Sequence, residues 1–139
     1  MWPFRARAKR ESAEAETARL GRQGERLARK LLRKRGMKVL AHNYRCPAGE
    51  ADLIALDTST RKELGAQTIA FVEVKTRRSD RHTPPESAVN TDKRRRMKRV
   101  ADYYLRSRKA TNYAIRFDIV AIVIREGREP EIRYIPGAF

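Results

Sequence analysis

The chain has little of what stabilises secreted proteins or anchors membrane proteins. It contains one cysteine, Cys46, in 139 residues, which excludes an internal disulfide and fits a reducing compartment. Residues 1–10 contain no apolar core of signal-peptide length, and no stretch approaches the length of a membrane span. No basic amphipathic segment carries the broad aromatic face that binding at a membrane interface requires. We therefore expect a soluble cytoplasmic protein without a membrane partner.

Several common catalytic motifs are also absent. The sequence has no Walker-type glycine loop and no Gly-x-Ser-x-Gly elbow, which excludes P-loop nucleotide hydrolases and serine esterases. The residues His42, His82 and Cys46 do not have the spacing of zinc ligands. No internal repeat or low-complexity tract is present. The chemistry must therefore be sought in a less familiar pattern.

Acidic residues are scarce relative to basic ones. The chain has 17 Asp and Glu against 33 Lys and Arg, for a formal net charge of +16. Such a charge destabilises the compact state through self-repulsion, so an anionic partner is the simplest reason to keep it. Nucleic acid is the first candidate, and docking on ribosomes or acidic proteins is an alternative. The length suits one domain with a modest core.

The apolar periodicity predicts a mixed β-sheet flanked by helices. Residues 1–18 are polar and lack an apolar stripe, so we expect an extension that is flexible or only partly helical, before a single domain over residues 19–139. A first helix is expected from Leu20 to Gly36 and a second from Thr91 to Ser107. The sequence predicts strands at Met37–Ala41, Ala51–Leu56, Ile69–Val74, Ala114–Ile124 and Glu131–Ile135, a polar hairpin connection at 57–67 and a loop at 79–85.

Charged residues interrupt two of the expected apolar strands. Glu73 and Lys75 are two positions apart, so their side chains should point to the same face, with Val72 and Val74 opposite. Asp52 occupies a similar place in the strand 51–56. Taking such charges out of water costs several kcal/mol each unless they are paired or bind a metal.

These three residues suggest metal-assisted chemistry. If their strands are adjacent, Asp52 and Glu73 supply the oxygen ligands that Mg²⁺ or Mn²⁺ prefers, and the Val74 carbonyl could add a third. Lys75 would orient or deprotonate the attacking water and steady the charge on a phosphate. Together they would hydrolyse a phosphodiester. The alternative is a salt bridge in which Asp52 or Glu73 pairs with Lys75 and does no chemistry.

Basic residues near these positions are candidates for phosphate contacts. Arg45, Thr76 and Arg77 adjoin the acidic cluster, although the two arginines could instead pair with Glu50 or Asp80. The helix 91–107 carries a basic outer face that is either an electrostatic track for phosphates or a solvated surface. Its members are Lys93, Arg94, Arg95, Arg96, Lys98 and Arg99.

Two further carboxylates lie in ordered segments. Asp118, within the apolar run 114–124, is expected to be a structural, hydrogen-bonded group. Glu25 lies at the border of the apolar stripe of the first helix, where it either pairs with Arg29 at i+4 or points inward.

Five segments, in this order and spacing, resemble the YraN-like family of uncharacterised bacterial proteins. They are Gly21–Glu25, Asn43–Cys46, Gly49–Ile54, Phe71–Arg77 and Arg116–Asp118. That family is itself similar to archaeal Holliday-junction resolvases and other PD-(D/E)XK nucleases, and the resemblance covers residues 20–139. It implies an α/β restriction-endonuclease-like fold with Asp52, Glu73 and Lys75 at catalytic positions. Glu25 matches the first-helix glutamate of resolvase-like proteins, a further metal or water contact.

The resemblance implies a nucleic-acid-binding protein that cuts phosphodiesters with Mg²⁺ or Mn²⁺, with DNA favoured over RNA. Resolvase-like relatives act as dimers, so a homodimer is one expectation. The connection 57–67 is longer than we expect for the family and is predicted to protrude. A catalytically silent nucleic-acid-binding module and a basic interaction protein remain the alternatives.

Overall fold

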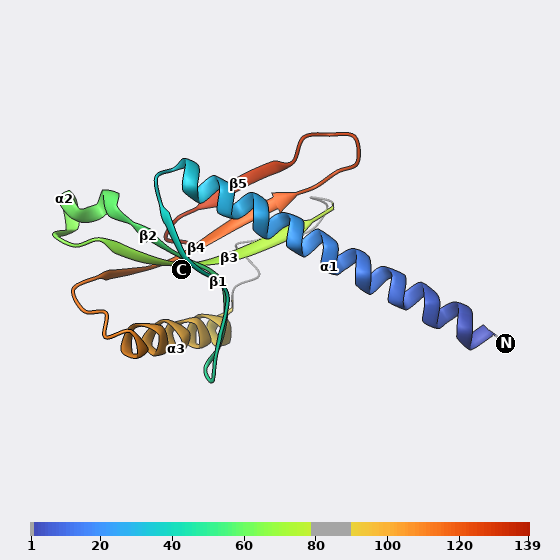
Figure 1. The fold of residues 1–139 in the computed structure, drawn as a ribbon, viewed down its shortest axis with the longest axis horizontal. Coiled ribbons are helices and arrows are strands. Elements are labelled where there is room, and N and C mark those ends of the chain that lie inside the picture. Colours follow the sequence, from blue (N-terminus) through green and yellow to red (C-terminus); the bar gives the residue numbers. More distant parts are fainter. Residues whose placement is uncertain (1, 79–89) are drawn as a thin grey trace.

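The computed structural model describes residues 2–78 and 90–139, so the loop expected at 79–85 lies outside the described residues. The helices are α1 (Trp2–Lys34), α2 (Arg61–Leu64) and α3 (Thr91–Ser107), with a 3₁₀ turn η1 (Thr58–Thr60) before α2 (Figure 1). The strands are β1 (Lys38–Cys46), β2 (Gly49–Asp57), β3 (Thr68–Arg77), β4 (Ala114–Val123) and β5 (Glu131–Ile135).

The five strands form one mixed sheet in the order β1-β2-β3-β4-β5. Neighbouring strands pair antiparallel except β3 and β4, which run parallel. A parallel pair needs a long crossover, and α3 lies in the segment that connects these two strands. The prediction of a mixed α/β sheet flanked by helices is confirmed, and the arrangement is compatible with a restriction-endonuclease-like fold.

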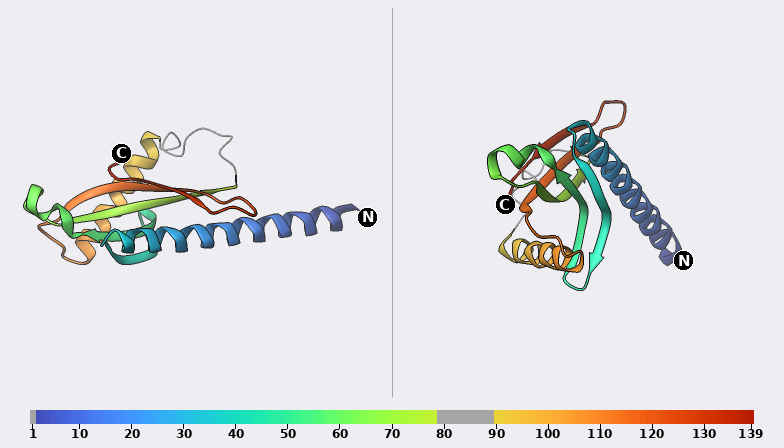
Figure 2. Two further views of the ribbon diagram at one scale, coloured as in Figure 1. Left: turned by 90° about the horizontal axis from the view of Figure 1, so that it is seen from above. Right: turned by 60° about the vertical axis from the view of Figure 1, so that its left-hand side comes forward.

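Each face of the sheet has its own hydrophobic core, because successive strand residues point to opposite faces. On one face α1 contributes Ala28 and Leu32, which pack against Val72 and Val120 among others. On the other face the apolar stripe of α3 packs on Ile54 and Phe71. The α3 stripe consists of Met97, Val100, Ala101 and Tyr104. Figures 1 and 2 show α1 and α3 on opposite sides of the sheet.

The expectation for the N-terminal extension was wrong in one respect, because α1 is a single helix of 33 residues that begins at Trp2. Residues 4–19 are exposed along it, and this half of α1 projects beyond the sheet (Figure 2). Ala, Glu and Arg are strong helix formers, so a helix persists without an apolar stripe, helped by pairs such as Arg7–Glu11. The described residues contain no helix long and apolar enough to cross a membrane.

Local capping residues determine the structure at the end of α1 and in the β2–β3 connection. Gly36 terminates α1 with φ 80°, and Met37 N donates to Leu32 O, as a glycine-capped helix end requires. The predicted hairpin connection is present and contains η1 and α2. Asp57 caps η1 through Ser59 N, and Gly65 ends α2 with φ 70°. The connection forms the end of the molecule farthest from the N-terminus (Figure 1).

Candidate functional site

Strand pairing brings Asp52 and Glu73 to adjacent positions on neighbouring strands. The last registered pair of β2 and β3 is Leu53 with Val72, and one step further Asp52 lies opposite Glu73. The Val74 N–H donates to Asp52 Oδ2 at 2.8 Å, which ties the carboxylate to β3. Glu73 follows Phe71 on the face that α3 covers.

Both carboxylates line a small cleft of ≈ 160 Å³ between the sheet and the start of α3. The other residues that line it are Glu50, Ala51, Lys93 and Met97. Three carboxylates and one ammonium thus surround a volume that holds only a few atoms, which suits an ion and its water ligands better than an organic cofactor.

Glu73 is the most deeply buried charge of this cleft. Its side chain is 10% exposed, and its Oε1 atom makes ion pairs with Lys75 Nζ at 2.9 Å and with Lys93 Nζ. Its second oxygen, Oε2, is buried and has no hydrogen-bond partner among the described residues. A buried carboxylate oxygen without a donor is costly, so this atom has unused capacity to bind a cation or a donor.

Asp52 is held in an environment that disfavours its charge. Burial is the main reason that the pKa of Asp52 is raised, and the carboxylates of Glu73 and Glu25 raise it further. The Val74 N–H and the Lys75 ammonium act in the opposite direction without reversing the shift. A divalent cation would relieve the repulsion among these carboxylates.

The two lysines at Glu73 respond differently to the same neighbour. Burial disfavours the Lys75 ammonium, but Glu73 and Asp52 outweigh it and raise the pKa of Lys75. Burial is the main reason that the pKa of Lys93 is lowered, and the adjacent Lys75 charge lowers it further. The Glu73 carboxylate acts in the opposite direction without reversing the shift. The raised pKa favours the ammonium form of Lys75, which can donate hydrogen bonds.

Glu25 approaches the cluster from α1 and is near enough to raise the pKa of Asp52. Its partner is Asn43 of β1: with the amide nitrogen turned toward Glu25, Asn43 donates to both carboxylate oxygens at 3.1 Å. Asn43 has φ 49°, a left-handed conformation that asparagine tolerates better than most residues. Of the two alternatives for Glu25, the structure therefore supports the one in which its side chain points inward, and not the pairing with Arg29.

Among the predicted phosphate contacts, Lys93 is the residue whose position in the structure differs most from the predicted one. The sequence assigned it to the outer face of α3, but its side chain is 26% exposed and turns inward to Glu73. Arg94, Arg95 and Arg96 are exposed, as predicted. The reason is helix geometry: Lys93 lies one turn before the buried Met97 and shares its face.

The three predicted phosphate contacts nearest the acidic cluster in the sequence lie in three different environments in the structure. Thr76 packs against Gly24 of α1, on the face of β3 opposite Lys75, and so lies away from the cleft. Arg45 is exposed and lies 3.5 Å from Glu50, as the alternative proposed. Arg77 is half-buried at the end of β3, where its carbonyl accepts from Ile124 N.

Asp118 is structural, as predicted. It is fully buried, and both of its oxygens are satisfied: Oδ1 by Arg116 Nε at 2.8 Å and Gly137 N at 2.9 Å, and Oδ2 by the Tyr134 hydroxyl at 2.5 Å. Arg116 also reaches Asp57 at 2.9 Å, so the network joins β2, β4 and β5. It makes no contact with the cleft.

The donor set at the cleft fits a hard divalent cation. No group of three or more His, Cys, Asp or Glu side chains within residues 2–78 and 90–139 is arranged to hold a metal. Asp52 and Glu73 are nevertheless the one or two carboxylates that Mg²⁺ sites commonly use, completed by water and substrate phosphate. The buried Glu73 Oε2, which has no partner in the part of the chain that the structure describes, is the observation that makes this fit specific.

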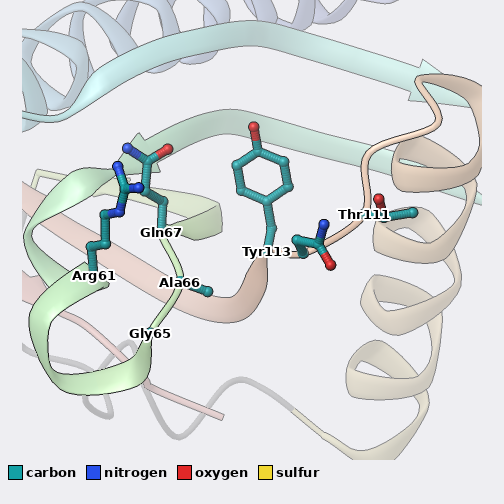
Figure 3. Close-up of a pocket in the computed structure, with 7 residues that line it drawn as sticks. Arg61, Gly65, Ala66, Gln67, Thr111 and Tyr113 are labelled. Atoms are coloured by element: carbon teal, nitrogen blue, oxygen red, sulfur yellow. The ribbon is translucent and has the colours of Figure 1, made fainter.

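A larger hollow of ≈ 380 Å³ lies elsewhere, where β3 and β4 begin (Figure 3). It is lined by Arg61, Gly65, Ala66, Gln67, Thr111, Asn112 and Tyr113. It contains a single charged side chain and no carboxylate, so it lacks the groups for metal-assisted chemistry. The smaller cleft is the better candidate.

Sequence reasoning named Lys93 and Asn43 but missed their contacts with Glu73 and Glu25. One signal for Lys93 was available: a cation in the first turn of a helix opposes the helix dipole, so it needs a compensating partner. Asn43 opens one of the segments that carry the family resemblance, but that segment did not indicate its partner, because the contact depends on how β1 and α1 pack.

The fold and the cleft define an α/β protein with buried carboxylates and two lysines between a mixed sheet and a helix. Residues 24–122 match the uncharacterised protein family UPF0102. The chain is 42% identical over 120 residues to UPF0102 proteins of Syntrophotalea carbinolica, Nocardia farcinica and Alkaliphilus metalliredigens. These matches cover 86% of this chain and 90%, 88% and 96% of the respective relatives. The chain therefore belongs to UPF0102, the YraN-like family.

Proposed function

We propose that this protein binds nucleic acid, DNA in preference to RNA, and hydrolyses its phosphodiester bonds with Mg²⁺ or Mn²⁺. The observation that carries the proposal is the buried Glu73 Oε2, which has no partner among the described residues although it belongs to a cleft that Asp52 also lines. Leaving a charged group unsatisfied costs about 1–3 kcal/mol or more, so a ligand role accounts for it better than a structural one.

In this proposal Asp52 and Glu73 hold the metal, and water and substrate phosphate complete its coordination. When bound, the metal would polarise the phosphate and neutralise charge that grows on it. A water oxygen bonds to phosphorus, the bond to one ester oxygen breaks, and a proton passes to that leaving oxygen. The raised pKa favours the ammonium form of Lys75, whose role in this proposal is to orient the water and stabilise charge on the phosphate.

The basic face of α3 supports a polyanionic substrate. Arg94, Arg95 and Arg96 are exposed and follow directly after Lys93, which lines the cleft. Exposed arginines beside an acidic metal site can neutralise the phosphates that flank a scissile bond.

A second candidate function rests on the ion pairs of Glu73. Because Lys75 and Lys93 both contact Oε1, the cluster could be a structural network in a nucleic-acid-binding module that cuts nothing. The two functions differ in whether the cluster is needed for a reaction or for folding.

The test compares cleavage with binding. Purified protein is incubated with linear, branched and single-stranded DNA and RNA in Mg²⁺, Mn²⁺ or EDTA. Wild type should cleave with metal and not in EDTA. Glu73→Ala and Lys75→Ala should each lower the cleavage rate by about 10²-fold or more. Both variants should still bind the same substrate in EDTA, because neither lies on the exposed face of α3.

Matched controls come from α2, where Lys62 and Glu63 are exposed. Lys62→Ala and Glu63→Ala should cleave like wild type. If wild type cleaves nothing with either metal, the silent binding module is the better description. If Glu73→Ala and Lys75→Ala unfold, the cluster is structural.

A further inference from the structure

Two ammonium groups contact the same oxygen of Glu73, while the other oxygen has no hydrogen-bond partner within residues 2–78 and 90–139. Lys75 comes from β3 and Lys93 from the first turn of α3, and both contact Oε1. A carboxylate that served only as a structural counter-ion would gain more by presenting one oxygen to each ammonium. The crowding at Oε1 therefore indicates that one lysine occupies a place that another cation can take.

The cleft identifies which lysine that is. Lys93 lines the cleft together with Asp52 and Glu73, whereas Lys75 is not among its lining residues. The Lys93 ammonium lies where a cation bound by the two carboxylates would have to enter. Lys75 contacts Glu73 from outside this space and can remain in place.

The position of Lys93 in its helix lowers the cost of breaking its ion pair with Glu73. Asn90 caps α3 and accepts from Lys93 N, so Lys93 lies in the first turn, where the helix dipole disfavours a cation. Partial burial adds a desolvation cost to the ammonium. Met97, one turn on, is packed in the core and holds the helix in place, so the side chain can move without the helix.

We propose that Lys93 is an internal counter-ion of Glu73 which a divalent cation displaces from the cleft. The inference rests on the proposed metal site at Asp52 and Glu73. In the metal-free protein Lys93 neutralises Glu73 and stabilises the gathered carboxylates. When a metal enters, the ammonium leaves Glu73 and turns toward the cleft mouth, beside the exposed arginines of α3, where it can meet a substrate phosphate.

Titration calorimetry with Mn²⁺ on the full chain tests this competition. Lys93→Met keeps much of the side-chain length but removes the ammonium, so Mn²⁺ should bind about tenfold more tightly than to wild type. Lys62→Met removes an exposed positive charge of α2, away from Glu73, and should change the Kd less than about twofold because solvent and salt screen exposed charges. Lys93→Arg keeps a cation at Glu73 and should bind Mn²⁺ no more tightly than wild type.

The outcomes separate this inference from the proposed function. An unchanged or weaker Mn²⁺ affinity in Lys93→Met would overturn it, even if wild type binds metal and Asp52→Asn does not. Equal tightening in Lys93→Met and Lys62→Met would also overturn it, because general charge would then be the cause. If neither wild type nor Lys93→Met binds Mn²⁺, both ideas fail. Should Lys93→Met not fold, tighter Mn²⁺ binding by Lys93→Arg than by wild type contradicts the inference.

Discussion

At the scale of single residues, two aspartates set into apolar strands show opposite uses of a buried carboxylate. Asp118 accepts hydrogen bonds at both oxygens from Arg116, Tyr134 and Gly137, so its charge is fully compensated. Asp52 accepts one hydrogen bond, from Val74 N, and faces two other carboxylates. A carboxylate whose charge is balanced by donors stabilises the fold. A carboxylate with few donors is repelled by its acidic neighbours, and a bound cation can relieve that repulsion.

Asp52→Asn should stabilise the protein at neutral pH while it abolishes metal-dependent cleavage. Because the folded state raises the pKa of Asp52, the native protein binds this proton more tightly than the unfolded chain does. The stability linked to this proton is fully present below the unfolded pKa and is lost as pH rises through the folded pKa. A neutral amide avoids that loss, so the free energy of unfolding at neutral pH should rise by about 0.5–2 kcal/mol.

Urea denaturation at neutral pH and at about pH 4, near the ordinary pKa of aspartate, measures this difference. The advantage of Asp52→Asn should shrink as pH falls, because wild-type Asp52 then becomes protonated. Asp102→Asn removes an exposed carboxylate of α3 and should change stability by no more than about 0.5 kcal/mol. A destabilised Asp52→Asn at neutral pH would assign Asp52 to the structural network.

At the scale of elements, the close approach of α1 to β3 depends on one glycine. A Cβ on Gly24 would lie 1.8 Å from Thr76 Oγ1, whereas a Cβ on Gly21 would meet nothing within 4 Å. Glu25, the next residue, is thereby held against the sheet beside Asn43. The glycine thus helps to set the distance between the α1 carboxylate and the cleft.

Gly24→Ala should destabilise the protein although alanine is the better helix former. The new methyl group must push α1 away from Thr76, a change that typically costs about 1–3 kcal/mol. Gly21→Ala is the matched control in the same helix, and should raise the free energy of unfolding by about 0.5–1 kcal/mol. Thermal or urea unfolding of both variants measures the contrast.

A second substitution identifies the cause. Thr76→Ala removes the Oγ1 atom and the Cγ2 methyl group that the new Cβ would meet, so it should recover part of the stability lost in Gly24→Ala. Equal effects of Gly24→Ala and Gly21→Ala would show that α1 can shift on the sheet without cost.

At the scale of the whole molecule, the chain has a net charge of +16, and the exposed basic turns of α3 place part of it beside the cleft. The arginines there differ in orientation. Arg96 lies beside Gly49 at the start of β2, next to the cleft residue Glu50, whereas Arg95 points away from the core-facing side of α3 that Met97 marks. A nucleic acid bound over the cleft would therefore meet Arg96 before Arg95.

Binding in EDTA should weaken steeply with salt, because each neutralised phosphate releases counter-ions. Arg96→Ala should lower the slope of log affinity against log salt by about one, and Arg95→Ala by less. Fluorescence anisotropy over a series of KCl concentrations measures the slope, with the exposed Lys62→Ala of α2 as the control. Salt-independent binding would point to a partner surface other than the basic face of α3, and equal effects of Arg95→Ala and Arg96→Ala would place the nucleic acid elsewhere on α3.

Elements with strong local signals were predictable. The helix α3 and the strand β5 have the expected bounds, Thr91–Ser107 and Glu131–Ile135, because an apolar stripe or run ends at clear capping and turn residues. The hairpin connection at 57–67 is confirmed, but the helical turns η1 and α2 inside it and the continuous helix over residues 2–18 were not predicted. Residues 4–18, η1 and α2 are helical without a buried face, so helix propensity and local caps, not hydrophobic periodicity, decide their structure.

The sequence by itself determined that Asp52, Glu73 and Lys75 are charges set into apolar strands, since alternation along a strand is local. It also determined the family, because motif spacing needs no coordinates. Only the tertiary structure decided that Lys93 turns inward and that Asn43 holds Glu25. Lys93 is 20 residues from Glu73 in the chain, and Asn43 is 18 from Glu25. Such contacts depend on strand register and on how the helices pack on the sheet, and ion pairs form only where these bring the groups within a few ångströms.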